Sequence, residues 1–496
     1  MRMAEAMPIE FHRDGPWELP EKWVWAPLGE VVDIHDGRRV PINAKEREQR
    51  LKGKKPEQLY PYYGATGQVG LIDGYLFDGD YVLLGEDGAP FLERSRAKSY
   101  AASGKFWVNN HAHILSARSV TLNRFLMHYL NYADYTEFVG GTTRLKLTQA
   151  DMVQIPIPVA PFAEQRRIVA RIDELFTEIA DGETALARAR DDLDTWRRAL
   201  LKAAVTGELT REWREHNAPQ ETAKDFLNRI RGKRLSSKST RFFDPDCSSL
   251  PMLPGAWAWT TVPELCISDQ RNGISIKGSP QPPGVKALRL DALTTNGLNP
   301  SACRYIPLDQ DRIASFKINP HDFLISRANG SPEFVGRGIY APNIEEELVF
   351  PDTIIRYPLF HSEMLGRWVQ LAWGSAYTRR QILGKAKTSA GILKISQDDI
   401  AQIAIPLPPE SEMTEAINTF KAESELGDAD DYLAQGNREA GKLRQSILKA
   451  AFEGRLVAQD QRDQPAERLL ARLSDQADTN GPLRARQRRR AVLAAR

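Results

Sequence analysis

The stretch that decides the fold is written twice in this 496-residue chain. Residues 19–25 read LPEKWVW, and residues 253–259 read LPGAWAW. Further along, LTQAD at 147–151 recurs as ISQDD at 395–399, and LLKAA at 200–204 recurs as ILKAA at 447–451. The motifs keep their order, so the sequence predicts an internal duplication with a rough two-fold relation. Two similar surfaces suit an elongated ligand with two half-sites, such as duplex DNA.

Composition indicates a globular protein: 42% of the residues are hydrophobic and 27% are charged. No apolar run is long enough to span a membrane, and the start of the sequence lacks the apolar core of a signal peptide. The three cysteines show no CxxC spacing, which argues against both a disulfide framework and a zinc site. We therefore expect a cytoplasmic protein without membrane association.

Each half has a strand-rich N-terminal part and a helical C-terminal part. Buried strands followed by glycine turns are predicted at 81–84 and 323–325, with residues 80–88 aligned to residues 322–330. The proline-rich runs 155–161 and 403–409 end the strand-rich parts and are expected to be stiff, extended connectors. The predicted fold class is α+β, with two similar mixed α/β globular domains separated by two long helices.

The helical C-terminal parts carry apolar residues in alternating steps of four and three, from Ile168 to Ala203 and from Leu426 to Ala450, with smaller apolar side chains in the second run. At ~1.5 Å per residue the first seam makes a rod on the order of 50 Å long. An antiparallel coiled coil between the two helices is predicted, and packing of each helix on its own domain is the alternative. The expected helix-packing residues are Ile168, Ile172, Leu175, Ile179, Leu193, Trp196, Leu200, Leu433, Leu443 and Ile447.

These features divide the chain into six segments. They are a first globular domain at 1–161, a long helix at 162–216, a basic linker at 217–250, a second globular domain at 251–409, a second long helix at 410–458 and a basic, disordered tail at 459–496.

The net charge of +2 does not by itself indicate nucleic-acid binding, but the charge is unevenly distributed. Basic runs at 38–55 and 376–394 place a cationic segment in each globular domain, as phosphate contact requires. Ordinary solvated surface charge is the alternative for either run. The candidate DNA-contacting residues are Arg38, Arg39, Lys52, Lys54, Arg379, Arg380, Lys385 and Lys387.

No catalytic constellation stands out. The NPP-aromatic motif of amino-methyltransferases, a Walker lysine, HExxH and GxSxG are absent from the sequence. His111 and His113 lie two residues apart on a predicted strand, where a metal pair is conceivable. The aligned residues of the second half are Asp352 and Ile354, so polar packing is the simpler explanation. We assign no catalytic residue and no metal ligand, and we expect a binding protein.

The segment PVAPFAEQRRIV at 158–169, together with the duplicated architecture, resembles the specificity subunit of type I restriction-modification systems over roughly residues 17–458. The second copy departs from this pattern, since residues 408–413 read PPESEM and lack the Gln-Arg pair. The resemblance implies that each globular domain is a target recognition domain that reads one half of a split double-stranded DNA sequence. It also implies that the helices space the two readers and dock two modification (methyltransferase) subunits, with restriction (translocase) subunits completing the complex.

The resemblance further implies a non-catalytic chain without its own cofactor. S-adenosylmethionine, ATP and Mg²⁺ are then expected in the partner subunits. Three alternatives remain open from the sequence. They are the specificity subunit of an orphan or related methyltransferase complex, a coiled-coil scaffold that does not read DNA, and a free-standing DNA-modifying enzyme, which would need the absent methyltransferase motif.

Overall fold

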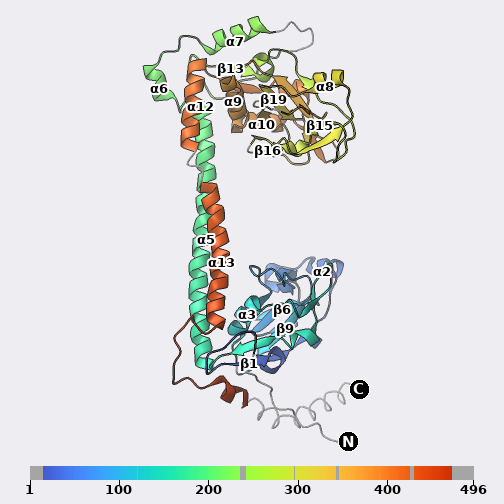
Figure 1. Cartoon of the computed structure of the whole chain (residues 1–496), viewed down its shortest axis with the longest axis vertical. Coiled ribbons are helices and arrows are strands. Elements are labelled where there is room, and N and C mark those ends of the chain that lie inside the picture. Colours follow the sequence, from blue (N-terminus) through green and yellow to red (C-terminus); the bar gives the residue numbers. More distant parts are fainter. Residues whose placement is uncertain are drawn as a thin grey trace. The chain divides into compact units, whose positions relative to one another are not determined.

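The computed structural model describes residues 15–119, 121–234, 242–294, 297–341, 344, 346–389, 391–424 and 429–471. The chain divides into two compact units (Figure 1). The first unit comprises Met1–Ala187 and Tyr432–Arg496, and the second comprises Arg188–Asp431. Each unit contains one mixed α/β globular domain together with parts of the long helices, so the predicted α+β class is confirmed. Among the described helices, none has the length and apolar character needed to cross a membrane.

The globular domain of the first unit is built on two four-stranded sheets. The antiparallel central sheet has the order β2 (Val32–Ile34), β9 (Ala112–Ala117), β6 (Tyr81–Gly85), β7 (Ser99–Ala102). The second sheet has the order β4 (Gly67–Ile72), β3 (Tyr60–Gly64), β8 (Lys105–Val108), β5 (Phe77–Asp78). Two ladders, β1 (Val24–Pro27) with β12 (Pro156–Val159) and β10 (Val139–Gly140) with β11 (Lys146–Leu147), complete the strands. The short helices are α1 (Leu28–Val31), η1 (Asp36–Arg38), α2 (Ala44–Leu51), η2 (Pro56–Gln58), α3 (Asn123–Tyr132) and α4 (Gln149–Met152).

Strand β6 lies at the centre of this domain because it buries both faces. Val82 and Leu84 point into the core that α3, the β1–β12 ladder and the long helices share. Leu83 points to the opposite side, where it packs with Phe77 and Phe106 beneath the second sheet. Alternate residues of a strand face opposite ways, so a continuous apolar run is what a doubly covered strand needs.

The globular domain of the second unit repeats this plan with different strands around it. Its central sheet has the order β14 (Arg271–Asn272), β23 (Ile354–Pro358), β19 (Asp322–Ser326), β21 (Gly338–Tyr340). Beside it lie the sheet β18 (Cys303–Ile306), β15 (Val285–Leu288), β22 (Leu348–Val349), the sheet β20 (Ala328–Asn329), β25 (Ile392–Lys394), β24 (Lys387–Ser389), and the ladders β13 (Ala258–Thr261) with β26 (Ala404–Leu407) and β16 (Leu293–Thr294) with β17 (Gly297–Leu298). The short helices are η3 (Val262–Leu265), η4 (Leu290–Ala292), α8 (Gln310–Phe316), α9 (Glu363–Trp373), α10 (Ala376–Lys385) and α11 (Gln397–Ile400).

The predicted alignment of residues 80–88 with 322–330 is wrong by one residue. Gly85 donates its amide to Lys98, and the corresponding bond in the second domain is made by Ser326 to Arg337. The counterpart of Gly85 is therefore Ser326, and Leu84 corresponds to Ile325, since both point into the helix-covered core. A one-residue slip moves every side chain of a strand to the other face. The counterparts of His111 and His113 are accordingly Thr353 and Ile355.

The proline-rich runs are strands rather than free connectors. Residues 156–159 pair with β1, and residues 404–407 pair with β13. Both ladders have two strands, and an edge position tolerates a residue that has no amide hydrogen. Each ladder positions the helix that follows it, α5 (Phe162–Val205) in the first case and α12 (Glu410–Ser424) in the second.

The first unit contains the antiparallel pairing of α5 with α13 (Ala429–Phe452). Arg444 forms a two-pronged ion pair with Glu183, at 2.5 and 2.7 Å. A Cβ added at Gly436 would lie 2.8 Å from the Leu186 side chain, so the glycine allows a close helix approach. Successive contacts run up α5 and down α13, as the coiled-coil prediction requires.

The predicted packing residues differ in how far they are buried. Ile168, Ile172, Ile179, Leu200 and Ile447 are buried, whereas Leu175, Leu193, Trp196 and Leu433 are half-buried. Leu443 is 52% exposed and lines the groove between the two helices together with Ile179 and Leu186, so its role in helix packing stays a prediction. Its neighbours Ile447 and Leu448 instead turn toward the globular domain. Leu426 lies outside the described residues.

The helix boundaries also differ from the prediction. α5 ends at Val205, and α6 (Arg211–His216) is a separate helix. The second long helix consists of α12 and α13, with residues 425–428 outside the described part of the chain. A positive φ of 75° at Gly207 and of 69° at Gly454 stops each helix in the left-handed conformation that glycine allows.

Each helix end packs against the opening motif of the other half of the sequence. An added Cβ at Gly454 would collide with Pro20, and one at Gly207 would collide with Pro254. Within the first unit, the Trp23 indole donates to the buried Glu164 carboxylate at 3.0 Å. Within the second, Trp257 donates to the buried Glu412 at 2.8 Å. The repeated tryptophan therefore anchors the start of its own half's helix.

The linker and the tail are more ordered than predicted. α7 (Ala223–Lys233) buries Phe226 and Ile230 in the core of the second domain, and its first amide bonds the Ala256 carbonyl at 2.9 Å. In the first domain the Ala466 amide bonds the Lys22 carbonyl at 3.0 Å, and Leu470 is buried. The duplication thus extends through residues 465–470, beyond the predicted boundary. Residues 472–496 lie outside the described residues.

Candidate nucleic-acid interface

The candidate site occupies the same place in both domains, where the central strand ends. In the first domain the Leu147 amide of the β10–β11 hairpin bonds the Glu86 carbonyl at 2.7 Å. In the second domain the Ile395 amide, which follows the β24–β25 hairpin, bonds the Arg327 carbonyl at 2.9 Å. A hairpin is thereby attached just beyond Gly85 and just beyond Ser326. We refer to these two places as the strand-end sites.

The strand-end site of the first domain is filled by paired charges. It comprises Asp36, Arg39, Glu86, Asp87, His111, His113, Arg144 and Lys146. Glu86 accepts from Arg39 at 2.6 Å and lies 3.2 Å from Lys146. Asp87 pairs with Arg144 at 2.8 Å, and His111 Nδ1 lies 2.6 Å from the same carboxylate without forming a hydrogen bond to it. Four separate stretches of sequence supply these groups, and the β6–β9 ladder together with the hairpin brings them into contact.

The carboxylates of this network are stabilised in their ionised form. Burial acts to raise the pKa of Asp36, but hydrogen bonds from His113 and the Ile114 amide and the charge of Arg39 lower it overall. Burial likewise opposes ionisation of Glu86, and the bond from Arg39 with the neighbouring positive charges lowers the pKa of that group. Ionised, paired carboxylates of this kind fix the geometry of the loops that carry them.

Asp36, Glu86 and His113 place one possible metal-ligand atom each within 4.8 Å of one another. However, His113 Nδ1 contacts Asp36 at 2.6 Å and His113 Nε2 contacts the Leu147 carbonyl at 3.0 Å. A histidine ligand needs a ring nitrogen with a free lone pair, and both nitrogens here face oxygen acceptors. Since Glu86 is also bound by Arg39, the contacts fit an internal polar network better than a metal site.

The outer rim of this site is cationic. The side chains of Arg144 and Lys146 are 59% and 53% exposed, although each is anchored at its acidic partner. The hairpin that carries them turns at Gly140 and Gly141 and contains little apolar surface. Two exposed cations held at a fixed position are the arrangement that phosphate contacts need.

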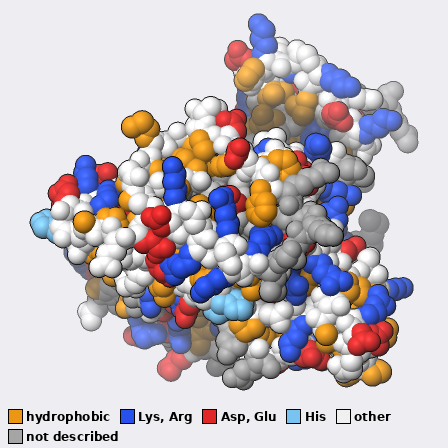
Figure 2. Space-filling view, turned by 90° about the horizontal axis from the view of Figure 1, so that it is seen from above, with side chains coloured by type: hydrophobic (Ala, Val, Ile, Leu, Met, Phe, Trp, Pro, Cys, Tyr) orange, Lys and Arg blue, Asp and Glu red, His pale blue; other side chains and the backbone are white. Residues whose placement is uncertain are grey.

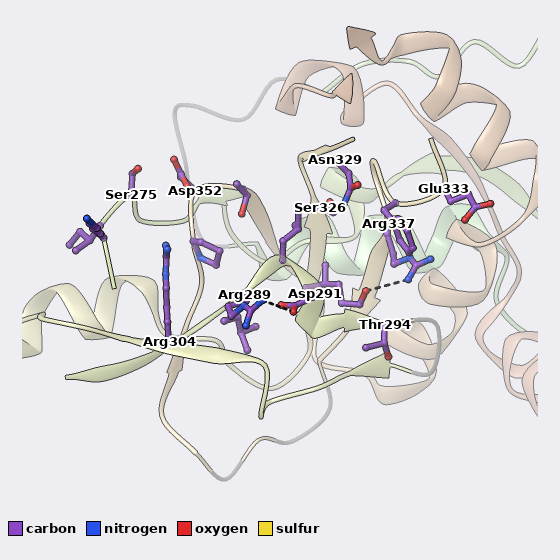
Figure 3. A pocket seen from close by; sticks show the side chains of 18 residues that line it. Ser275, Arg289, Asp291, Thr294, Arg304, Ser326, Asn329, Glu333, Arg337 and Asp352 are labelled. Atoms are coloured by element: carbon purple, nitrogen blue, oxygen red, sulfur yellow. Dashed lines mark hydrogen bonds and ion pairs between the residues drawn. The ribbon is translucent and has the colours of Figure 1, made fainter. Parts of the chain in front are cut away.

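The strand-end site of the second domain opens into a pocket of about 1210 Å³ (Figure 3). Ser326 forms part of its wall, and Arg304 and Arg337 line it from different strands and loops. Arg289 is paired with Asp291 at 2.9 Å. Arg337 donates to the Leu293 carbonyl at 3.3 Å and its guanidinium lies 4.3 Å from the Phe334 ring centre. Burial lowers the pKa of Arg337.

The hairpin beside this pocket is also cationic. Asn329, which lines the pocket, pairs with Leu393 in the β20–β25 ladder. Lys387 and Lys394 are opposed in the β24–β25 register, and both are exposed. The pocket and the basic hairpin therefore form one continuous site.

The predicted DNA-contacting residues are distributed unevenly. Only Arg39 and Lys387 lie at a strand-end site, and Arg39 is bound there by Glu86. Arg379 donates to the Val335 and Pro332 carbonyls, a structural role, and burial lowers its pKa. Lys385 donates to Gln402 at 2.9 Å.

The remaining candidates are exposed, namely Arg38, Lys52, Lys54 and Arg380. Arg38 donates to the Leu76 carbonyl, and Lys54 lies 3.8 Å from Asp73. Much of the 38–55 run serves to hold α2 to the domain, since Arg47 stacks on Tyr62 and Arg50 on Trp107. DNA contact by these exposed residues stays a prediction.

Sequence reasoning missed Arg144 and Lys146 in the first domain and the pocket residues of the second. The sequence did contain a signal for Lys146, because it directly precedes the LTQAD motif just as Lys394 directly precedes the duplicated ISQDD motif. No comparable signal marks the pocket. Figure 2 shows lysine and arginine side chains interspersed with acidic and apolar ones over the visible face, so charge alone does not outline a site.

The fold and the paired sites define a class of duplicated proteins in which each half presents a basic hairpin at the end of a buried strand. A family model described as the type I restriction modification DNA specificity domain matches residues 20–186. A putative type I restriction enzyme specificity subunit of Haemophilus influenzae is 39% identical over 151 residues, which cover 30% of this chain and 37% of the relative. The EcoKI specificity subunit of Escherichia coli is 25% identical over 476 residues, covering 90% and 92% of the two chains.

A solved chain from a study of complex assembly and conformational transition of the type I R-M system has the same fold. Its TM-score is 0.59 at 18% identity, and the match covers 89% of this chain and all of that one. The chain is therefore similar to type I restriction-modification specificity subunits, and its residues 20–186 match the DNA specificity domain of that family.

Proposed function

We propose that this chain reads a bipartite DNA target, with one half-site bound by the strand-end site of each globular domain. The observation that carries the proposal is that both domains place two exposed cations on a hairpin at the same strand end, although the residues differ. Arg144 and Lys146 serve in the first domain, and Lys387 and Lys394 in the second. Repetition of the position with divergence of the side chains is what two readers of different half-sites require.

The proposal assigns no catalysis to this chain. Methyl transfer would belong to two modification subunits, and translocation and cleavage to restriction subunits, in a cytoplasmic complex. S-adenosylmethionine, ATP and Mg²⁺ would then bind in those partners. The similarity to type I specificity subunits supports this division of labour in general terms.

A groove on the helix pair of the first unit supports the docking of partner subunits. It has a volume of about 640 Å³ and lies between α5 and α13, where Gly182 and Gly436 leave the seam thin. Leu443 projects from its rim with half of its surface exposed. An apolar groove between two helices is a suitable seat for a further helix.

Domain exchange tests the proposal. Residues 1–161 are replaced by the corresponding domain of another specificity subunit, and the methylated sequences of the host genome are determined. One half of the methylated motif should change while the other half and its orientation persist. The reciprocal exchange of residues 251–409 is the control and should change the other half. A change in both halves from either exchange contradicts separate half-site reading.

A gel-shift with a random duplex pool and the purified partner subunits separates this function from that of a scaffold that does not read DNA. Retention of duplex that depends on this chain supports the reader. Partner assembly without any duplex retention supports the scaffold.

A further inference from the structure

The pocket of the second domain holds a buried polar group that the protein itself does not use. Ser326 is 2% exposed, and its hydroxyl has no hydrogen-bond partner among the described residues. Across the pocket, the buried Nε of Arg304 also lacks one. Buried polar atoms are nearly always hydrogen-bonded, and leaving one unpaired carries a penalty in folding free energy. Two such atoms in the wall of one pocket indicate a ligand that would pair with them.

The fold does not require a serine at this position. The counterpart in the first domain is Gly85, where the strand forms the same bond to its neighbour. There the Ala89 Cβ overlaps the place that a Cβ would occupy, and the Ala65 carbonyl oxygen lies 3.0 Å from it. In the second domain Ser326 lines the pocket, and its hydroxyl oxygen lies just beneath the pocket surface, covered by neighbouring atoms. Ser326 is therefore explained by what enters the pocket rather than by the strand.

The lining combines apolar wall with charges of both signs, and Arg304 is a basic side chain in it without an acidic partner among the described residues, so it indicates a flat, partly apolar ligand with an anionic group. The charged residues are Lys277, Arg289, Arg304, Arg337, Asp291, Glu333 and Asp352. In Figure 3, Arg304 stands at a distance from Arg337 and Glu333, with Ser326 between them. Leu288 and Leu293 supply apolar wall, and the Arg337 guanidinium lies over the Phe334 ring, 4.3 Å from its centre. Aromatic and guanidinium planes stack on nucleobases, while an arginine without an acidic partner suits a phosphate. A nucleotide combines these features in one molecule.

The shape of the site indicates how such a ligand would arrive from DNA. Base edges in an intact duplex lie at the floor of a groove, so a protruding element is needed to read them. A concave site can take only what projects from the duplex, either the sugar–phosphate ridge or a nucleotide rotated out of the stack. The apolar wall favours the base. The adjoining lysines of the β24–β25 hairpin are placed to hold flanking phosphates.

We propose that the pocket of the second domain binds a nucleotide through both its base and its phosphate, and that the nucleotide is one rotated out of the bound duplex. This rests on the proposed DNA-reading function. A free mononucleotide shares the chemistry, so the experiment has an arm for each source.

The test measures binding of the full chain to three probes. They are a matched duplex, the same duplex with a single extrahelical nucleotide, and free deoxyadenosine monophosphate as competitor. An extrahelical nucleotide has already been unstacked, so the bulged duplex should bind on the order of tenfold more tightly than the matched one. Competition by the mononucleotide at concentrations that leave the matched duplex bound would assign the pocket to free nucleotide as well.

Two variants tie the effect to the pocket. Ser326→Ala removes a hydroxyl that bonds nothing in the described protein, so the melting temperature should not fall, whereas the preference for the bulged duplex should drop several-fold. Arg304→Gln should reduce the same preference. The matched control is Ser375→Ala, since Ser375 is also buried in this domain but its hydroxyl bonds Thr378. This variant should melt earlier and keep the preference.

The outcomes separate the two proposals. Equal binding of matched and bulged duplexes, together with no competition by mononucleotide, overturns the nucleotide pocket and leaves DNA reading intact. A bulge preference that survives Ser326→Ala and Arg304→Gln also overturns it. If the chain binds no duplex but binds deoxyadenosine monophosphate directly, and Ser326→Ala abolishes that binding, the pocket assignment stands and the DNA-reading function is overturned.

Discussion

In the first domain the end of strand β6 is closed, because the Ala89 Cβ and the Ala65 carbonyl fill the space beside Gly85 and charged pairs occupy the rest. In the second domain Ser326 stands at that position, and the space is an open pocket with unpaired polar groups in its wall. The ladders around both positions form the same hydrogen bonds. The backbone plan is therefore common to the two domains, and the side chains at one strand end decide whether the site is a filled surface or a cavity.

The two domains also differ in the contacts of the buried glutamate at the start of the long helix, and this difference gives the largest expected effect. Glu412 accepts from Trp257 and Thr210 and forms an ion pair with Arg214, while Glu164 accepts from the neutral donors Trp23 and Gln459. Glu412→Ala should destabilise the second domain by about 3–5 kcal/mol, because it leaves a partly buried arginine unpaired. Glu164→Ala should cost about 1–3 kcal/mol in the first domain.

Native-state hydrogen exchange on peptides from β19 and β6 reports the two domains separately and checks this difference. Equal destabilisation of the two domains would show that the ion pair to Arg214 adds nothing.

The second prediction concerns pH. Burial raises the pKa of Asp322 to about 7, which the Arg356 charge 3.8 Å away and a bond from the Asn319 amide only partly offset. Between about pH 4 and 7 the folded domain then holds a proton that the unfolded chain has released, so stability falls as pH rises. The loss is on the order of 2–4 kcal/mol.

In the first domain Tyr81 occupies the position of Asp322, so no carboxyl group titrates there. The lowered pKa of Asp36 instead makes the stability of the first domain fall as the pH drops below about 4, the opposite dependence on pH. Urea denaturation at several pH values, with Asp322→Asn as the control variant, measures the effect. A second domain whose stability does not change between pH 4 and 7 contradicts a protonated Asp322.

Exchanging the two strand-end residues sharpens the contrast between filled and open sites. Gly85→Ser places a Cβ against Ala89 and the Ala65 carbonyl, so it should destabilise the first domain by about 1–3 kcal/mol. Ser326→Gly removes a side chain that lines the pocket and leaves no overlap, so it should destabilise the second domain by only about 0.5–1 kcal/mol, the usual penalty of glycine in a strand. Thermal denaturation of the two variants should therefore show the larger shift for Gly85→Ser. The reverse order would mean that the pocket is not open in the folded protein.

The smallest expected effect lies in the salt dependence of DNA binding. Removing Lys387 and Lys394 together should reduce the slope of log affinity against log salt by about 1.8, as two lost phosphate contacts require. Arg144→Ala with Lys146→Ala should reduce it similarly, and should weaken binding further because Asp87 loses its arginine and Glu86 its lysine. Lys385→Ala is the control, since this lysine bonds Gln402. Unchanged slopes for both pairs would remove the hairpins from the interface.

The duplication, the two long helices and the likeness to specificity subunits were all predictable from the sequence, because they rest on motifs and periodicities that repeat over many residues. Ile168, Ile172 and Ile179 are buried as their spacing predicts. Leu443 keeps the spacing but is exposed, because the helix turns its neighbours Ile447 and Leu448 toward the globular domain. Periodicity identifies a seam, but it does not say which partner covers each position.

The candidate site was harder to predict than the fold. Basic runs are local in sequence, and most of the residues they selected either bond their own domain, as Arg379 does, or lie away from the strand ends. The groups that meet at the first strand end come from four stretches of chain. The pocket residue Ser326 resembles any other serine at the end of an apolar strand.

By itself the sequence indicated that the protein is built from two copies of one unit, each with a buried strand and a long helix, although it predicted the helices at 162–216 and 410–458. These are properties of local pattern, which burial and backbone hydrogen bonding impose along the chain. Only the tertiary structure decided the register of the copies, since a shift of one residue leaves the apolar pattern intact but turns each side chain to the opposite face. It also decided that one strand end is filled and the other open, because the Ala89 Cβ and the non-local Ala65 carbonyl meet at that place in the first domain.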